Sequence, residues 1–452
     1  MPPPKRIVTP FSLPIYAFGL AVALGSLALS HPACLTDGYI RPIDAVFTAT
    51  SAVCVTGLIV VDTGSFFTPL GQTVILALIQ LGGLGIMTYT SLALILLRRR
   101  VSMTDRLAVG QSLLHDPAFD LRRFLYLVVT GSLALEAMGC LALWALDPHG
   151  FNIFSAAFHS ISAFCNAGFA LQADSLMPWH DNIPVNLVFM VLITIGGLGF
   201  TVVNELVHKT IDTARGAKVR RLSFHTRIVL TTSAMLVVAG TGAIFLGEVF
   251  GSAVRDASIW ERLLHALFQS VTSRTAGFNT VEIGAMSNVA LVFMMMLMYV
   301  GGSPGSTAGG TKTTTARAVV GFVVSQIKGR PQTVVGNRAL DQETMNKAIT
   351  LTIVAGLTVA VATLVLSITE AHLGAEGLHR GNFIELFFEV VSAFGTVGLS
   401  TGVTPKLSDT GRAIIITLIF VGRLGPILFL TALQEWQTKP HYAWAKEGLM
   451  IG

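Results

Sequence analysis

The sequence predicts an all-α polytopic membrane protein built from four repeats, and three observations support this fold class. Of the 452 residues, 52% are hydrophobic and only 12% are charged, whereas about 25% are charged in a typical soluble domain. Charge-free stretches of about 20 residues, the length of a membrane helix, recur along the chain. One short glycine-containing phrase occurs four times between these stretches.

The charge-free stretches define eight expected membrane spans. They are residues 11–30, 70–97, 124–146, the stretch between Asp181 and Glu205, the stretch between Arg227 and Glu248, the stretch from about Ile283 towards Lys312, 348–369 and 413–433. The third contains one acid, Glu136, and the eighth contains one charge, Arg423. The connections after the second, fourth and sixth spans carry six Lys or Arg residues each, and the other connections carry at most three. Because basic loops remain in the cytoplasm, we expect a multi-pass protein of the cytoplasmic membrane with both termini inside. The net charge of +5 then reflects topology in a lipid bilayer and not nucleic-acid binding.

Each repeated phrase lies between an odd-numbered span and the next even-numbered span. The phrases are TSAVCVTG, ISAFCNAG, SVTSRTAG and VSAFGTVG, and they align on Gly57, Gly168, Gly277 and Gly398. They recur at intervals of about 110 to 120 residues, a period that indicates internal repeats. We therefore expect four repeats at residues 1–115, 116–225, 226–340 and 341–452.

A short apolar segment precedes each aligned glycine. A large apolar residue stands ten positions before the glycine, namely Phe47, Phe158, Leu267 and Phe388, and six positions before it stand Ser51, Ser162, Val271 and Ser392. About ten helical residues cover about 15 Å, which is half of the hydrocarbon core. The segments are therefore predicted to be re-entrant pore helices that enter and leave on the external face. Non-helical backbone at that depth is tolerated beside a water-filled cavity, which four such turns around one pore would supply.

The four residues that end at each aligned glycine are the candidate ion-binding residues, here called the filter strings. They are Cys54, Val55, Thr56 and Gly57; Cys165, Asn166, Ala167 and Gly168; Arg274, Thr275, Ala276 and Gly277; and Gly395, Thr396, Val397 and Gly398. Pore helices would direct their partly negative C-terminal ends towards the axis. The backbone carbonyls after them could replace the water shell of a cation, as in potassium filters.

Two properties of the filter strings favour K⁺ as the bound ion. The strings contain no carboxylate, so recognition would fall to backbone oxygen, which suits K⁺ better than a strongly hydrated divalent ion. Glycine fits their ends because it adopts positive φ freely and leaves no Cβ atom in the lumen. The alternative is that the four glycines only allow close helix packing, as small residues do in membranes.

These motifs resemble the Trk/Ktr/HKT superfamily of cation transporters, and its KtrB-like bacterial branch in particular. The resemblance covers nearly the whole chain and rests on the phrases TSAVCVTGL, ISAFCNAGF, SRTAGFNT, SAFGTVGLSTG, IQLGGLGIMT, ITIGGLGF and FVGRLGP. It implies a potassium-uptake subunit that forms a homodimer with one pore in each protomer. It also implies a cytosolic nucleotide-binding ring of the KtrA or TrkA type, stimulation by Na⁺ and no covalent cofactor. Gly57 implies potassium, because a serine at this position is associated with sodium preference in plant HKT members.

A glycine-rich segment interrupts the sixth span within residues 301–315. Its candidate gate residues are Gly301, Gly302, Ser303, Pro304, Gly305, Ser306, Thr307, Ala308, Gly309, Gly310, Thr311 and Lys312. Five glycines and a proline oppose helix formation, so we expect a break near mid-membrane and a helix that resumes towards Arg317. A nucleotide-binding P-loop fits poorly, because there is one residue too many before Lys312. A passive kink and a mobile gate remain, and the resemblance favours an intramembrane gating loop.

Charged residues inside apolar segments form a second group of candidates. Arg423 lies within the eighth span, and an intramembrane charge is a functional hypothesis by default. We expect it to donate to the broken sixth span and to place an electrostatic barrier below the filter, a role that the resemblance also implies. The alternative is a structural cation bonded to freed carbonyls. Arg274 should point away from the axis towards an acid such as Glu282 or Glu389.

The leading functional hypothesis is K⁺ uptake driven by the membrane potential. A sodium-selective or nonselective cation transporter on the same scaffold is the first alternative. A secondary transporter would call for inverted repeats and a buried acidic site, whereas these repeats share one orientation. An enzyme is not expected, because the sequence offers no nucleophile–base pair, metal constellation or ATPase motif. Glu136, Glu205, His159 and His265 are interpreted as structural residues.

Overall fold

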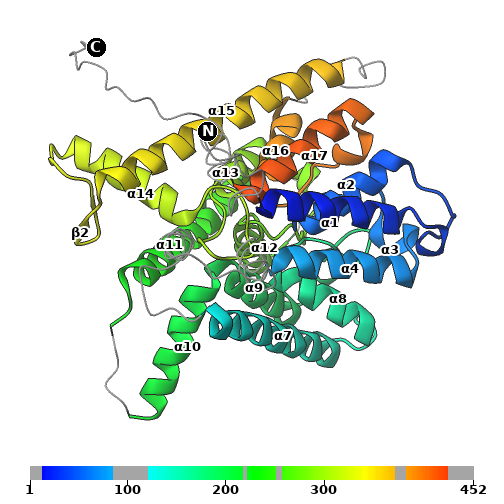
Figure 1. The fold of residues 1–452 in the computed structure, drawn as a ribbon, viewed down its shortest axis with the longest axis horizontal. Coiled ribbons are helices and arrows are strands. Elements are labelled where there is room, and N and C mark those ends of the chain that lie inside the picture. The colour runs from blue at the N-terminus through cyan, green and yellow to red at the C-terminus, as the bar shows by residue number, and fades with distance from the viewer. Residues whose placement is uncertain (1–12, 85–120, 217–220, 251–256, 372–382, 426–452) are drawn as a thin grey trace, which may run out of the picture.

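The computed structural model of the chain is a bundle of helices that differ widely in length (Figure 1). It describes residues 13–84, 121–216, 221–250, 257–371 and 383–425. Within these ranges the strands are limited to β1 (Val334–Val335) and β2 (Arg338–Ala339), which form an antiparallel hairpin. The mostly helical architecture agrees with the predicted class. The predictions about both termini, the arginine cluster at residues 98–100 and the first repeat boundary lie outside the described residues.

Twelve of the helices group into four units of three. The units are α1 (Leu13–Leu29), α2 (Pro42–Val53) and α4 (Pro69–Gly83); α7 (Leu121–Leu146), α8 (Ile153–Phe164) and α9 (Ile183–Leu198); α11 (Phe224–Gly247), α12 (Ile259–Thr272) and α13 (Asn288–Tyr299); and α15 (Gln342–Glu370), α16 (Phe383–Gly395) and α17 (Asp409–Leu424). In each unit all three helices pack against one another. The second helix of each unit is a short one of 12 to 14 residues.

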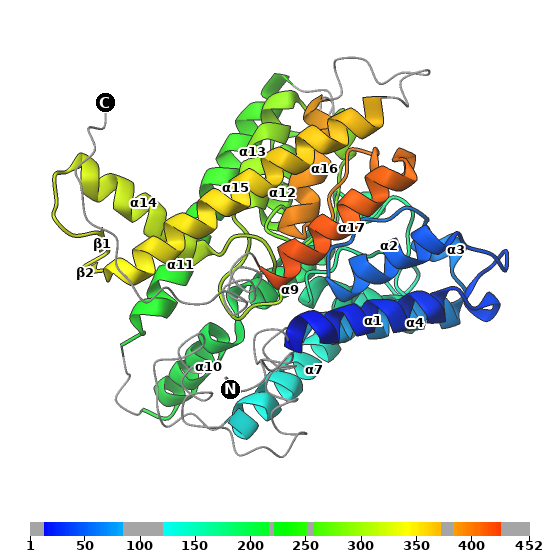
Figure 2. The same ribbon diagram turned by 45° about the horizontal axis from the view of Figure 1, so that its top comes forward.

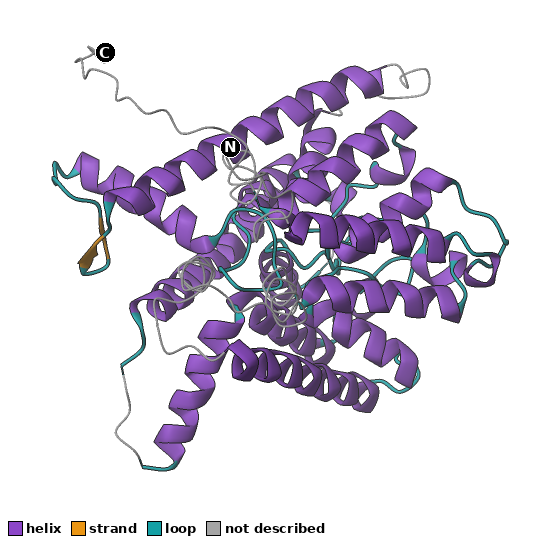
Figure 3. Cartoon of the chain, in the orientation of Figure 1, coloured by secondary structure: helices purple, strands orange, loops and turns teal. Residues whose placement is uncertain are grey.

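Neighbouring units meet through one recurring contact. The third helix of each unit packs against the short helix of the next unit, as α4 with α8, α9 with α12, and α13 with α16. The fourth contact, α17 with α2, joins the last unit to the first, and these helices lie side by side in Figures 1 and 2. The four units therefore close into a ring, and non-helical segments lie among the helices in the middle of the molecule (Figure 3).

The remaining elements extend the ring or connect its parts. They are α3 (Thr63–Phe66), α10 (Phe200–Ala214), α14 (Thr313–Ile327) and the 3-10 helices η1 (Pro32–Cys34), η2 (Met177–Trp179), η3 (Glu248–Phe250), η4 (Ile283–Ala285) and η7 (Thr404–Lys406). Helix α14 packs against α15 and the hairpin at the edge of the molecule (Figure 2). There Ala318, Met345 and Ala348 form a small core separate from the main one.

Local sequence signals explain where the short helices begin. Asn152 caps α8 through its side-chain oxygen, which accepts from Ser155 N at 2.9 Å. Ser258 and Glu261 form a reciprocal capping box at the start of α12. Such caps satisfy amide groups that have no partner inside the helix. The short helices α8 and α12 are therefore fixed at their N-terminal ends, and the other end of each leads into a filter string.

The expected spans are found in part. The helices Tyr126–Leu146, Phe224–Gly247 and Gln342–Glu370 are each long and apolar enough to cross a membrane. The fourth span, expected between Asp181 and Glu205, is bent, because α9 and α10 meet at an angle of 107°. The bend occurs at Gly199, whose φ of +89° does not fit an α-helix. In the sixth span α13 ends at Tyr299 and helix resumes at Thr313, so the expected break is present.

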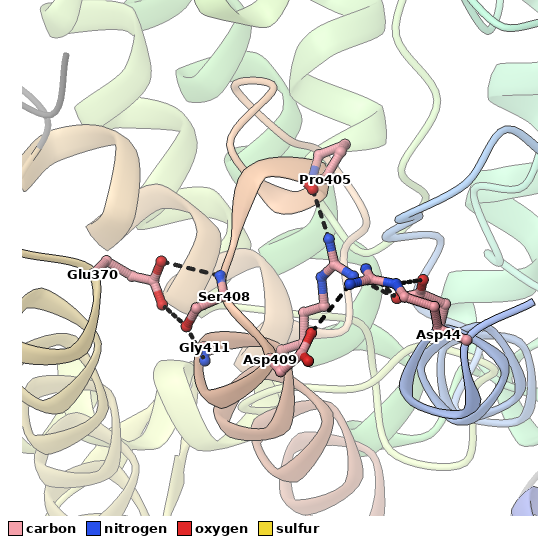
Figure 4. Close-up of polar contacts among 8 residues, drawn as sticks. Asp44, Glu370, Pro405, Ser408, Asp409 and Gly411 are labelled. Atoms are coloured by element: carbon pink, nitrogen blue, oxygen red, sulfur yellow. Dashed lines mark hydrogen bonds and ion pairs between the residues drawn. The ribbon is translucent and has the colours of Figure 1, made fainter. Parts of the chain in front are cut away.

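The first and fourth units are joined by buried polar contacts at the starts of α2 and α17 (Figure 4). Asp44, in the first turn of α2, accepts from Arg412 Nη1 of α17 at 2.5 Å. Beside this pair, Glu370 at the end of α15 accepts from Ser408 N at 3.2 Å and from Ser408 Oγ at 2.7 Å. Since Ser408 is the N-cap of α17, these contacts fix that helix against α2 and α15.

Candidate functional site

The four filter strings leave the short helices through the same unusual backbone conformation. Two positions before each aligned glycine φ is positive, at Val55 (55°), Asn166 (58°), Thr275 (77°) and Thr396 (49°). Among the described residues only Ser175 is a further non-glycine example. Positive φ is a genuine outlier for β-branched residues such as Val and Thr. Strained backbone of this kind concentrates at functional sites, so its fourfold recurrence marks the strings as one site.

The aligned glycines face one another in a closed ring. A Cβ atom built on each would lie less than 3.0 Å from the carbonyl oxygen that precedes the next aligned glycine. The pairs are Gly57 with Ala167, Gly168 with Ala276, Gly277 with Val397, and Gly398 with Thr56. The glycines themselves have φ of 91°, 69°, 79° and 93° in chain order. A side chain at any of them would therefore meet backbone, and the fourth pair returns the ring to the first string.

Hydroxyl groups on the short helices form hydrogen bonds with the backbone at the ends of the filter strings. Ser51 Oγ donates to the Leu58 carbonyl at 2.7 Å and accepts from Gly57 N at 3.1 Å. Matching bonds in two other repeats run from Ser162 Oγ to the Phe169 carbonyl at 2.8 Å and from Gly398 N to Ser392 Oγ at 3.1 Å. The serines six positions before the glycine thus hold the strained turns in place.

The third repeat is one residue shorter between its helix and its glycine, which corrects the predicted alignment. Thr272, not Val271, supplies the hydroxyl there, and its Oγ1 donates to the Phe278 carbonyl at 2.7 Å. The buried aromatic residue of that helix is likewise Phe268, 1% exposed, whereas Leu267 is only partly buried. Alignment on the glycine alone had shifted both positions by one.

Glycines in the third helix of three units allow those helices to touch the short helices. A Cβ atom on each would lie less than 3.0 Å from the last carbonyls of the short helix in its own unit. The pairs are Gly82 with Val53, Gly196 with Phe164, and Gly422 with Phe394. These glycines are therefore contact points between the third helices and the residues that lead into the filter strings.

The glycine-rich loop, residues 300–312, joins α13 to α14 and doubles back on itself. Gly301 N donates to the Thr311 carbonyl at 2.8 Å, and Thr313 N donates to the Gly302 carbonyl at 3.1 Å. The two ends of the loop therefore lie side by side. Beside these paired ends, Gly309 packs against the side chain of Thr396 in the fourth filter string. The loop lies directly against the ring of strings.

The same loop is attached to the bend between α9 and α10. Ser303 N donates to the Gly197 carbonyl at 3.1 Å, and Phe200 N donates to the Gly305 carbonyl at 3.1 Å. Ser303 Oγ also donates to the Leu198 carbonyl. The positive φ of Gly199 frees these groups from the helix, and the loop supplies their partners. The bend of the fourth span and the break of the sixth span are one linked feature.

Two cationic side chains donate hydrogen bonds to carbonyls of the loop, Arg423 from α17 and Lys312 from the end of the loop itself. Arg423 of α17, 5% exposed, donates through Nη1 to the Thr307 carbonyl and through Nη2 to the Gly82 carbonyl at 2.6 Å. Lys312 Nζ donates to the Ala308 carbonyl at 2.7 Å. Arg423 therefore connects the loop, the fourth unit and the first unit, which is the contact the sequence led us to expect.

Comparisons with known proteins identify the family. The family model described as "TrkH: Cation transport protein" matches residues 21–435. The chain belongs to the TrkH family of cation transport proteins. It is 36% identical to "Ktr system potassium uptake protein B" of Bacillus subtilis (strain 168), over 93% of this chain and 92% of that protein.

Two further TrkH-family comparisons cover almost the whole chain. The "Potassium/sodium uptake protein NtpJ" of Enterococcus hirae is 32% identical over 99% of this chain and 98% of that protein. The crystal structure of "the Potassium Transporter TrkH from Vibrio parahaemolyticus" matches with a TM-score of 0.71 at 21% identity. That match covers 96% of this chain and 87% of the other, and it shows a shared fold.

Arg274 of this TrkH-family chain does not have the partner suggested by the sequence. Its Nη2 donates to Ser233 Oγ of α11 at 3.2 Å, and among the described residues it forms no ion pair with Glu282 or Glu389. Glu389 instead accepts from Ser400 Oγ at 2.7 Å. An acidic partner could not be chosen from the sequence, because helix α11 and the third string meet only in the folded chain.

A recurring contact between a polar residue of the short helices and the chain after the aligned glycine was not predicted from the sequence. His159 Nε2 accepts from Leu171 N at 3.3 Å, and Glu389 Oε1 accepts from Thr401 N at 2.9 Å. Both stand nine positions before the aligned glycine and hold the chain three positions after it. The recurrence of a polar residue at this position was the available signal, and the structural interpretation of His159 agrees with its contacts.

Proposed function

We propose that this chain is the pore-forming subunit of a potassium uptake system and carries K⁺ through the ring of filter strings. The observation that supports this most directly is the closed ring of four aligned glycines, each against the carbonyl that precedes the next one. Relatives at 36% and 32% identity are named for potassium uptake and for potassium and sodium uptake. Together they favour a K⁺ path at the centre of the four units.

The proposed path uses backbone oxygen in place of water. Carbonyls of the filter strings would replace the hydration shell of K⁺, and the four short helices would add the partly negative ends of their dipoles. Within the described ranges no group of three or more His, Cys, Asp or Glu residues could hold a metal ion. Ion binding would therefore depend on backbone geometry, which the strained turns and their hydroxyl braces define.

The glycine-rich loop would act as the gate of this path. It lies against the fourth filter string, and its own hydrogen bonds attach it to α9, α17 and α14. Ions that leave the ring would have to displace it. Inward movement of one charge gains about 2.3 kcal/mol per 100 mV of membrane potential, so no nucleotide hydrolysis by this chain is needed to drive uptake.

The membrane arrangement and the partners complete the proposal. Both termini would be cytoplasmic, two copies would form a homodimer, and a cytosolic nucleotide-binding ring would sit on the basic inner face. The charge distribution of the connections supports the cytoplasmic termini, and the names of relatives as proteins B and D of a Ktr system support a system with more than one component. Na⁺ would stimulate uptake without being the main substrate.

Growth at limiting K⁺ tests the function. The parent chain, supplied with a ring-forming partner, should rescue a strain that lacks potassium uptake. Gly57→Ser should abolish rescue or admit Na⁺, because its Cβ atom would meet the Ala167 carbonyl. Gly336→Ser is a matched control, since Gly336 also has positive φ but its Cβ atom would meet nothing within 4 Å. Failure of the parent to take up Rb⁺, a K⁺ tracer, would contradict the proposal.

Sodium transport is the second candidate, and the name of the Enterococcus hirae relative favours it. Uptake of labelled Na⁺ and Rb⁺ by the same preparation separates the two. Preference for Rb⁺ supports potassium uptake, and equal or greater Na⁺ uptake supports the alternative.

A further inference from the structure

Glu136 is a buried acid in a membrane-spanning helix, and it lies close to the second filter string. It belongs to α7, one of the helices long enough to cross a membrane, and it is 4% exposed. Acidic residues in such positions are rare and usually functional. From the sequence alone, Glu136 is interpreted as a structural residue. Its contacts in the folded chain decide between a structural role and a functional one.

The carboxylate of Glu136 connects two repeats. Gln80 Nε2 of α4 donates to both carboxylate oxygens at 3.1 Å. On the other side, Cys165 Sγ lies 3.9 Å from Glu136 Oε1 and 3.8 Å from Gln80 Oε1. Cys165 is the first residue of the second filter string and immediately precedes Asn166, whose φ is 58°. Only one side chain therefore separates the carboxylate from a strained turn.

The third repeat provides an internal comparison. Ser160 Oγ donates to the Glu136 carbonyl at 2.6 Å, and Ser270 Oγ donates to the Val237 carbonyl at 2.9 Å. These bonds place Glu136 and Val237 at the same position of their repeats. A partly buried valine fills that position in the third repeat. The packing of the short helix on the long helix therefore does not call for an acid, and the carboxylate of Glu136 has a different purpose.

Contact with α4 makes the second filter string sensitive to this carboxylate. A Cβ atom on Gly83 would lie less than 3.0 Å from Cys165 Sγ, so Cys165 is enclosed between α4 and Glu136. Removal of the carboxylate would leave the Gln80 amide and the Cys165 thiol without their shared acceptor. Buried polar groups that lose a partner rearrange at a cost in free energy. The movement would reach Asn166 and the carbonyl of Cys165.

We propose that Glu136 is a positioning residue that sets the preference of the second filter string for K⁺ over Na⁺ by holding Cys165. This inference rests on the proposed function, because it assumes that the filter strings select the ion. K⁺ and Na⁺ differ in radius, and a filter distinguishes them through the geometry and the field of its carbonyls. A residue that holds one quarter of this geometry contributes to selectivity without touching the ion.

The test is the ratio of Rb⁺ to Na⁺ uptake by the full chain in proteoliposomes. Glu136→Val copies the third repeat and should lower the ratio about threefold to tenfold, the range expected when one hydrogen bond is lost. Glu136→Gln keeps one carbonyl acceptor and should lower it less. Glu248→Gln is the control, because Glu248 is 6% exposed and accepts from the backbone N–H of Ser287, the N-cap of α13, at 2.7 Å. Its ratio should match the parent.

A double variant tests whether Glu136 acts on the second filter string through Cys165. Cys165→Ala combined with Glu136→Val should give the same ratio as Glu136→Val alone, since both changes break one connection. Additive losses would overturn the route. An unchanged ratio in Glu136→Val would overturn the inference, and if that variant does not reach the membrane, an unchanged ratio in Glu136→Gln would do so. Absence of Rb⁺ uptake by the parent would instead contradict the proposed function.

Discussion

At the scale of single residues, Arg423 illustrates how a charge is retained inside the bundle. A buried guanidinium is tolerated only when hydrogen bonds replace its water, and Arg423 donates to the Thr307 and Gly82 carbonyls. Both acceptors became available because glycines interrupt the helices there. The arginine therefore holds the glycine-rich loop in its position against the filter strings.

Neutralising Arg423 should open the path. In Arg423→Gln the loop loses a charged donor, and because such hydrogen bonds are worth about 1.5–3 kcal/mol, Rb⁺ uptake should rise about tenfold or more. Arg423→Lys keeps the charge and should raise uptake less. Uptake is measured in proteoliposomes, with size-exclusion chromatography as the control for folding. An unchanged rate in a well-folded Arg423→Gln protein would show that the arginine is only structural.

Residue-level prediction succeeded where a position recurs and failed where a contact depends on the folded chain. Gly57, Gly168, Gly277 and Gly398 were found because four copies of one phrase are visible in the sequence. The hydroxyl of Thr272 was missed because a one-residue shortening cannot be seen when only the glycine is aligned. The Ser233 partner of Arg274 joins positions 41 residues apart, and nothing in the sequence pairs them.

At the scale of elements, the breaks in α9 and in the sixth span differ in how well sequence predicts them. Five glycines and a proline within residues 301–310 make a helix unfavourable by themselves. The bend at Gly199 lies within the phrase GGLGF, residues 196–200. This bend depends on a tertiary contact, because Phe200 N is satisfied by the Gly305 carbonyl of the loop. The bend therefore could not be derived from local propensity.

The loop should behave as a removable element. Gly301 N already donates to the Thr311 carbonyl, so deletion of residues 303–309 joins two ends that lie side by side and should leave α13 and α14 in place. Rb⁺ uptake should rise more than in Arg423→Gln, because every contact made by residues 303–309 is lost. Ser303→Ala, which removes one donor to the Leu198 carbonyl, is the matched milder variant. Uptake at or below the parental rate after deletion would exclude a gating role.

At the scale of the whole molecule, the fourfold ring has one junction that differs from the others. Chain connections pass from the first unit to the second, third and fourth, but the contact of α17 with α2 joins the two ends of the order. Asp44 accepts there from Arg412 and also from Arg41 Nε at 2.8 Å. The side chains of Asp44 and Arg412 are 7% and 8% exposed. No chain connection links the fourth unit back to the first, and a buried ion pair stabilises the contact between them. The filter strings of the same two units also meet, where Gly398 faces the Thr56 carbonyl.

Breaking this pair should loosen the entire ring. Asp44→Asn leaves Arg412 buried without its carboxylate, a change that costs about 3–5 kcal/mol, so thermal unfolding in detergent should shift clearly downwards. Arg412→Gln should shift it less, because Asp44 keeps its pair with Arg41. The double change Asp44→Leu with Arg412→Met should recover much of the loss, because no unpaired charge remains. Lys347→Ala is the control: the side chains of Lys347 and its partner Glu343 are 60% and 77% exposed, and surface pairs contribute about 0–1 kcal/mol.

Since Gly57 and Gly398 lie across the same junction, the single variants should also lower the Rb⁺ to Na⁺ uptake ratio. Single variants as stable and as selective as the parent would mean that packing of α2 on α17 closes the ring without the ion pair.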